Sequence, residues 1–193
     1  MELTDLHRSV EAILFAAGEP VEVSRLSMAL EMDSADIIKA ANELADSMAF
    51  DRRGIRIIRL DNAYQMVSSG EMADYITKAL ETRKPPKLSA SQLESLTIIA
   101  YYQPATKAMV EQIRGVDSSY SVGALLNKHL IEEAGRLNVP GRPILYRTTA
   151  DFLRTFGISS LEELPDIERI SFGEPLEVEM EQQQIQEPVE EGT

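Results

Sequence analysis

Residues 88–146 read LSASQLESLTIIAYYQPATKAMVEQIRGVDSSYSVGALLNKHLIEEAGRLNVPGRPILY. Three short segments have apolar residues at helical spacing, and they are separated by Gln103-Pro104 and by Gly115. A capping box of Ser91 to Glu94 is expected to start the first helix. Two extended segments, residues 130–137 and 144–148, are then joined through a turn at residues 138–142, which contains Pro140-Gly141. Three helices followed by a two-stranded hairpin are the layout of a winged helix.

The first 80 residues show the same order of elements. Apolar residues predict a first helix that Gly18-Glu19-Pro20 ends, then a short helix at Val23–Leu30, and a third helix that begins at Asp33 or Ser34. Residues 55–60 and 63–68 alternate and are joined by Asp61-Asn62, which predicts a hairpin. One more helical segment covers residues 72–80.

The sequence therefore predicts a mainly α chain with small β-hairpin wings (α+β), folded as two tandem winged-helix domains. The expected boundaries are residues 1–82 for the N-terminal domain, 83–88 for a proline-containing linker and 89–166 for the C-terminal domain. Residues 167–193 form an acidic tail, rich in Glu and Gln, which is expected to be disordered. That tail is either an interaction segment or merely solubilising.

Charge and composition limit the class of protein. The net charge is −13, and it divides into −6 for residues 1–80, +3 for residues 81–160 and −10 for residues 161–193. No cysteine is present, so the chain has no disulfide and no cysteine-based metal site. The acidic start of the chain is unlike a secretory signal, and no apolar run is long enough to span a bilayer. We expect a cytoplasmic protein without a membrane partner.

DNA binding is the usual expectation for a winged helix, and the charges argue against it. The third helix reads bases in such domains, so it needs basic or amide side chains on its outer face. The first domain's third helix carries Lys39 among Asp33, Asp36, Glu43 and Asp46. In the second domain Asn127 and Lys128 come near the helix end, whereas base contacts usually come from its start. We expect direct DNA binding to be weak or absent.

Enzymatic activity has no support in the sequence. The chain has no phosphate-binding loop of the GxxxxGK[ST] or GxGxxG type. Its two histidines, His7 and His129, lie in different domains, and no spaced set of metal ligands is present. We therefore expect no catalytic residue, no cofactor and no metal.

Protein contacts are the remaining role for the surfaces. Phe15 adds apolar area to the first helix, where it either completes the core or supports self-association. Of Tyr101 and Tyr102, one is expected to be buried and the other exposed.

Four basic residues are expected around the second wing: Arg114, Arg136, Arg142 and Arg147. Three kinds of partner are open for them: phosphate, an acidic segment of a partner protein, or the internal carboxylates of Glu132, Glu133 and Asp117. Another cluster on the first wing is read as a solvated strand face: Arg52, Arg53, Arg56 and Arg59.

Three blocks of this sequence resemble one bacterial family. Residues 13–20 read ILFAAGEP, residues 93–104 read LESLTIIAYYQP and precede IRGV at 113–116, and residues 135–157 contain VPGRPILY. These motifs are similar to those of the segregation and condensation protein B family. The resemblance covers roughly residues 5–166 and is looser across residues 20–80.

The resemblance implies a non-enzymatic subunit of the bacterial condensin-like complex, acting in chromosome condensation and segregation. Such a subunit forms a homodimer through its N-terminal domain. It binds the kleisin subunit, segregation and condensation protein A, which bridges the heads of the SMC ATPase. The protein would then be nucleoid-associated through the complex.

Candidate contact residues follow from this reading. Kleisin contacts are expected at Tyr101, Tyr102, Arg114, Arg136, Arg142 and Tyr146. Dimer contacts are expected at Leu3, Leu6, Val10 and Phe15. The alternatives are a tandem winged-helix transcription regulator that binds DNA, and an interaction module with a different partner.

Overall fold

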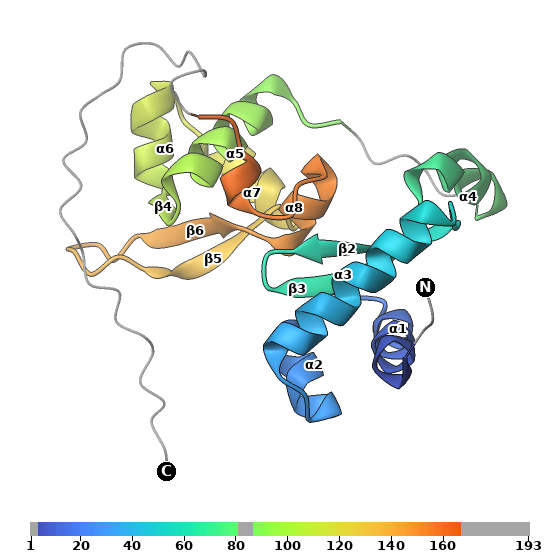
Figure 1. Ribbon diagram of the computed structural model, residues 1–193. Helices are drawn as coiled ribbons and strands as arrows, with labels where there is room; N and C mark the ends of the chain where they lie inside the picture. Colours follow the sequence, from blue (N-terminus) through green and yellow to red (C-terminus); the bar gives the residue numbers. More distant parts are fainter. Residues whose placement is uncertain (1–3, 81–86, 167–193) are drawn as a thin grey trace.

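The computed structural model describes residues 4–80 and 87–166 (Figure 1). In the first domain the elements are α1 (Asp5–Ala17), β1 (Val21–Glu22), α2 (Val23–Leu30), α3 (Ser34–Phe50), β2 (Ile55–Leu60), β3 (Ala63–Ser68), the 3-10 turn η1 (Gly70–Met72) and α4 (Ala73–Ala79). In the second they are α5 (Ala90–Tyr102), β4 (Ala105–Thr106), α6 (Lys107–Arg114), α7 (Ser119–Asn127), β5 (Ile131–Arg136), β6 (Ile144–Thr148), α8 (Ala150–Phe156) and η2 (Leu161–Glu163).

The two domains repeat one topology. Each has a three-stranded antiparallel sheet, with strand orders β1-β3-β2 and β4-β6-β5. In each, a short first strand follows the first helix, and a hairpin follows the third. The fold prediction is therefore confirmed: the chain is mainly α with small β-hairpin wings and contains two tandem winged-helix domains.

Local signals explain the first domain's helices and hairpin. Thr4 accepts a hydrogen bond from the backbone N–H of His7 and starts α1, and Gly18 ends it with a φ of 65°. The His7 imidazole lies 3.0 Å from the Glu43 carboxylate, which links α1 to α3. Asp61 in the β2–β3 turn has a φ of 55°, in the left-handed region that two-residue hairpin turns use.

One capping prediction is wrong. The capping box of α5 joins Ser89 to Gln92, not Ser91 to Glu94. Both pairs fit the sequence pattern, because SASQLE contains two overlapping S-x-x-Q/E spacings. The helix begins at Ala90, so Ser91 lies inside it, and its hydroxyl lies 2.6 Å from that of Ser121 on α7.

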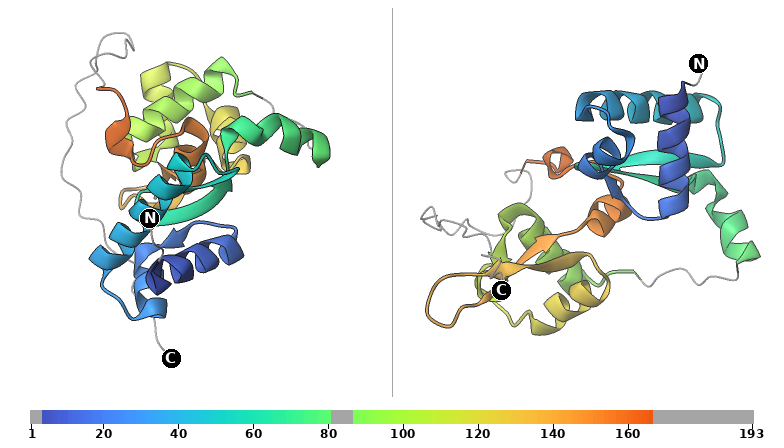
Figure 2. Two further views of the ribbon diagram at one scale, coloured as in Figure 1. Left: turned by 45° about the vertical axis from the view of Figure 1, so that its right-hand side comes forward. Right: turned by 90° about the horizontal axis from the view of Figure 1, so that it is seen from below.

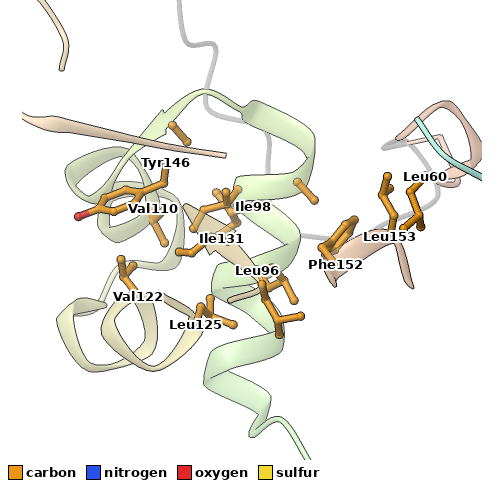
Figure 3. Close-up of a cluster of buried hydrophobic side chains, with 14 residues drawn as sticks. Leu60, Leu96, Ile98, Val110, Val122, Leu125, Ile131, Tyr146, Phe152 and Leu153 are labelled. Carbon is orange, nitrogen blue, oxygen red and sulfur yellow. The ribbon is translucent and has the colours of Figure 1, made fainter. Parts of the chain in front are cut away.

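The core is divided between two clusters of buried side chains. One belongs entirely to the first domain and includes Leu14, Leu44 and Tyr64. The other fills the second domain, but it also contains Leu60 of β2 (Figure 3). The last α-helix of the second domain, α8, lies between the β2–β3 hairpin and the rest of the second domain (Figures 1 and 2). Sequence patterns did not predict α8 or this contact.

The predicted linker and tail fall mostly outside the described part of the chain. Residues 81–86 separate the domains, so the exact boundary at residues 82–89 stays a prediction. The predicted disorder of residues 167–193 also lies outside the described residues.

Candidate partner-binding surfaces

The outer face of α1 forms one wall of a groove of mixed polar and apolar lining in the first domain. On this helix Val10 and Leu14 are fully buried, whereas Phe15 is 74% exposed. Phe15 therefore does not complete the core. The groove is open and lies between α1 and the sheet; its lining consists of Asp5, Arg8, Ser9, Glu11, Ala12, Phe15, Ile55 and Met66.

The four residues expected at a dimer interface differ in their surroundings. Phe15 is exposed in the groove, and Leu6 is half-buried against the first core cluster. Val10 is 0% exposed, so it can affect association only through the shape of α1. Leu3 lies outside the described residues. Ile55 and Met66 complete the groove but carried no sequence signal, because β2 and β3 meet α1 only in the folded domain.

In the second domain Arg114 is an internal residue. Its side chain is 7% exposed and donates two hydrogen bonds to Glu94 Oε2, at 3.0 and 3.2 Å. It also donates to the hydroxyls of Ser91 at 2.9 Å and Ser118 at 2.8 Å. Arg114 thus joins α5, α6 and the start of α7, with Glu94 rather than Asp117 as its ion-pair partner.

The second wing carries the exposed candidates. Arg136 and Arg142 are exposed, and Arg136 Nη1 donates to the backbone carbonyl of Arg142 at 3.1 Å. Arg147 on β6 pairs with Glu132 at 2.7 Å, as one of the alternatives anticipated. Arg142 has a φ of 38°, next to Gly141 at 89°, so the turn is built from left-handed backbone. The end of the wing thus carries two exposed guanidinium groups, one of which is bonded to the backbone of the wing itself.

The three tyrosines are less accessible than the wing arginines. Tyr101 and Tyr102 are both half-buried, so the expected division into one buried and one exposed ring is wrong. The hydroxyl of Tyr101 donates to the carbonyl of Pro165 at 2.5 Å, and Tyr102 packs against the second cluster. Tyr146 is 8% exposed, and its burial, together with the nearby Glu133 carboxylate, raises its pKa.

The faces that would read DNA are acidic or apolar. On α3, Asp36 and Asp46 are exposed. The start of α7 exposes Tyr120, at 82%, beside Asp117, whose pKa is lowered by two hydrogen bonds from Ser119. On the first wing, Arg53 lies near Glu11 and Asp51 at 3.8 and 3.4 Å. The geometry shows no basic recognition helix in the described residues.

No helix in residues 4–80 and 87–166 is both long and apolar enough to cross a membrane. Within those ranges, no group of three or more histidines and carboxylates is placed to hold a metal ion.

The fold defines a class of protein with two tandem winged-helix domains. The family model for segregation and condensation complex subunit ScpB matches residues 8–167. Segregation and condensation protein B of Lachnoclostridium phytofermentans is 48% identical over 86% of this chain and 87% of its own length. The protein of the same name from Clostridium acetobutylicum is 40% identical over 98% of this chain and 91% of its own. The chain belongs to the ScpB family.

Solved structures also match. The crystal structure of ScpB from Mycobacterium tuberculosis is 29% identical, covers 82% of this chain and 99% of its own, and has a TM-score of 0.39. The crystal structure of a dimer of an ScpB N-terminal domain complexed with an ScpA peptide is 28% identical, covers 38% of this chain and 91% of its own, and has a TM-score of 0.36.

Proposed function

We propose that this chain is a non-enzymatic, homodimeric subunit of a chromosome segregation and condensation complex, and that it binds the kleisin subunit bridging the SMC ATPase heads. The observation that carries the proposal is the family match over residues 8–167, which spans both winged-helix domains. An adaptor of this kind needs surfaces for protein partners rather than a reactive site. The exposed groove on α1 and the exposed arginines of the second wing supply such surfaces.

The groove on α1 is the proposed dimer contact. Phe15 is a large apolar side chain left in water, and apolar area of this kind favours association. In a symmetric dimer the same patch is used by both copies. Arg8 and Asp5 at the groove would then lie at the edge of the interface, where opposite charges of the two copies can face each other.

The second wing is the proposed kleisin contact. Arg136 and Arg142 are exposed, and their planar guanidinium groups suit carboxylates on a partner segment. Arg114 is not an exposed member of this surface, because its guanidinium group already donates hydrogen bonds to Glu94, Ser91 and Ser118. Its proposed role is to hold α6 and α7 in place behind the wing domain.

The deciding experiment is light scattering coupled to size-exclusion chromatography, on the chain alone and mixed with the kleisin from the same cell. A dimer that forms a stable heavier complex with the kleisin supports the proposal. A chain that ignores the kleisin contradicts it. The transcription-regulator alternative would then be tested by a DNA titration.

Two matched pairs of variants locate the surfaces. Phe15→Ser should shift the chain toward monomer, whereas Phe50→Ser, at an even more exposed phenylalanine on the end of α3, should leave the dimer intact. Arg142→Glu should weaken kleisin binding about tenfold, as expected for reversing a charge near an interface edge. Lys39→Glu, on the exposed face of α3, is its control. If Phe50→Ser gives monomer and Phe15→Ser does not, the groove on α1 is not the dimer contact. If Arg142→Glu leaves the affinity for the kleisin unchanged, the second wing is not the kleisin contact.

A further inference from the structure

The helix α8 contacts both winged-helix domains. Thr149 caps its start, where the hydroxyl accepts the N–H of Phe152 at 3.3 Å, and Gly157 caps its end with a φ of 70°. Its inner side chains, Phe152 and Leu153, are buried in the second cluster. Leu60, the last residue of β2 in the first domain, is only 3% exposed because it packs into the same cluster. Figure 3 shows Leu60 beside Leu153.

Polar contacts between the domains lie beside this apolar contact. Arg154 Nη1 donates to Gln65 Oε1 on β3 at 3.2 Å, and Arg154 Nη2 is held by Asp151 at 2.7 Å. Gln65 is 4% exposed, and its Nε2 donates to the carbonyl of Gly18, at the end of α1, at 3.1 Å. The backbone N–H of Asp61 donates to the carbonyl of Ser159 at 2.6 Å.

These contacts connect α8 and Ser159, which follows it, with the β2–β3 hairpin, and Gln65 in turn bonds to the end of α1. Arg154 also satisfies a buried amide oxygen, and an amide left without a partner would be costly in that position. Two domains joined only by a linker are expected to move relative to each other unless their interface resists it. Here Leu60 is part of the second domain's core, so separating the domains exposes apolar surface and breaks hydrogen bonds together.

We propose that α8, together with Ser159 just after it, is a strap that fixes the relative orientation of the two winged-helix domains, independently of residues 81–86. The strap consists of the Leu60–Leu153 contact, the Arg154–Gln65 hydrogen bond and the Asp61–Ser159 hydrogen bond. The proposal concerns the chain by itself, so it stands or falls separately from the kleisin and dimer surfaces. Its consequence is that α1 and the second wing are presented at a constant orientation.

Spin-label distance measurements on the full chain test the strap. The native chain has no cysteine, so Ala29→Cys on α2 and Ala108→Cys on α6 give unique exposed labelling sites in different domains. Labelled chain is diluted with unlabelled chain, so that distances within one copy dominate. The strap predicts one narrow distance distribution. Arg154→Glu, which places a carboxylate against Gln65 Oε1 and Asp151, should broaden it, and Leu60→Ser combined with Arg154→Glu should broaden it further.

The control is Lys39→Glu, which should leave the distribution narrow. Circular dichroism checks that each variant keeps its helices. If Leu60→Ser unfolds the second domain, the distance distribution of Arg154→Glu alone tests the strap. The Arg154 side chain is partly exposed and lies outside the core, so its replacement should not unfold the domain. A broad distribution in the otherwise native chain overturns the proposal, and so does a distribution in Arg154→Glu that is as narrow as the control.

Discussion

Arg114 connects three helices of the second domain through one side chain. Four hydrogen bonds reach Glu94, Ser91 and Ser118, and the last of these is fully buried. Because Glu94 is half exposed, the ion pair itself contributes little, and the bonds to the buried Ser118 hydroxyl and the partly buried Ser91 hydroxyl contribute more. The fork geometry of arginine is needed to reach all three residues at once.

We therefore predict that Arg114→Ala lowers the free energy of unfolding by about 2 kcal/mol, measured by urea denaturation. Arg114→Lys should recover only part of this loss, because an ammonium group cannot make the same fork. The control is Arg136→Ala on the exposed wing, which should change stability by less than about 0.5 kcal/mol. Equal losses for Arg114→Ala and Arg136→Ala would show that the network around Arg114 is not a stabilising unit.

At the scale of elements, the start of α5 depends on Ser89 and not on Ser91. The hydroxyl of Ser89 accepts the N–H of Gln92 at 3.3 Å, and the Gln92 side chain accepts the N–H of Ser89 at 3.2 Å. Ser91 instead belongs to the network of Arg114 and Ser121. The two serines are two residues apart but should differ in what their loss disturbs.

Ser89→Ala should cost about 1 kcal/mol, the usual value of an N-cap. A double-mutant cycle with Arg114→Ala separates the two serines: Ser89→Ala should be additive within about 0.5 kcal/mol, whereas Ser91→Ala should show a coupling larger than that. Urea denaturation of the single and double variants supplies the values. Coupling of Ser89, in place of Ser91, to Arg114 would contradict this assignment.

Most elements followed from local patterns. The predicted segments Val23–Leu30, Ile55–Leu60, Ala63–Ser68 and Ile144–Thr148 agree with the structure at both ends. Their signals are local: apolar periodicity, and turn residues such as Asp61-Asn62. The two-residue strands β1 and β4 were not predicted, because each exists only by pairing with a strand about 40 residues further along, such as Val21 with Tyr64.

At the scale of the whole molecule, charge distribution decides the expected behaviour toward DNA. The net charge is −13, and the third helix of the first domain has exposed carboxylates. Such surfaces repel phosphates, whose neutralisation supplies most non-specific DNA affinity. The exposed wing arginines, Arg136 and Arg142, are too few to reverse this.

We predict a dissociation constant weaker than about 100 µM for a short duplex at about 0.15 M salt, measured by fluorescence anisotropy. At low salt, any residual binding should come from the second wing and should fall further with Arg142→Glu. Binding tighter than about 1 µM at about 0.15 M salt, with a steep salt dependence, would instead favour the DNA-regulator alternative.

The sequence by itself determined the repeated order of elements, the division of charge along the chain and the motifs shared with the ScpB family. These properties depend on neighbouring residues, so they can be read along the chain. Tertiary structure alone decided that Phe15 is exposed while Leu14 is buried, that Arg114 is occupied internally and that Leu60 packs into the other domain's core. Arg154 and Gln65 are 89 residues apart. The physical reason is that exposure and pairing depend on contacts between distant segments, which no local pattern encodes.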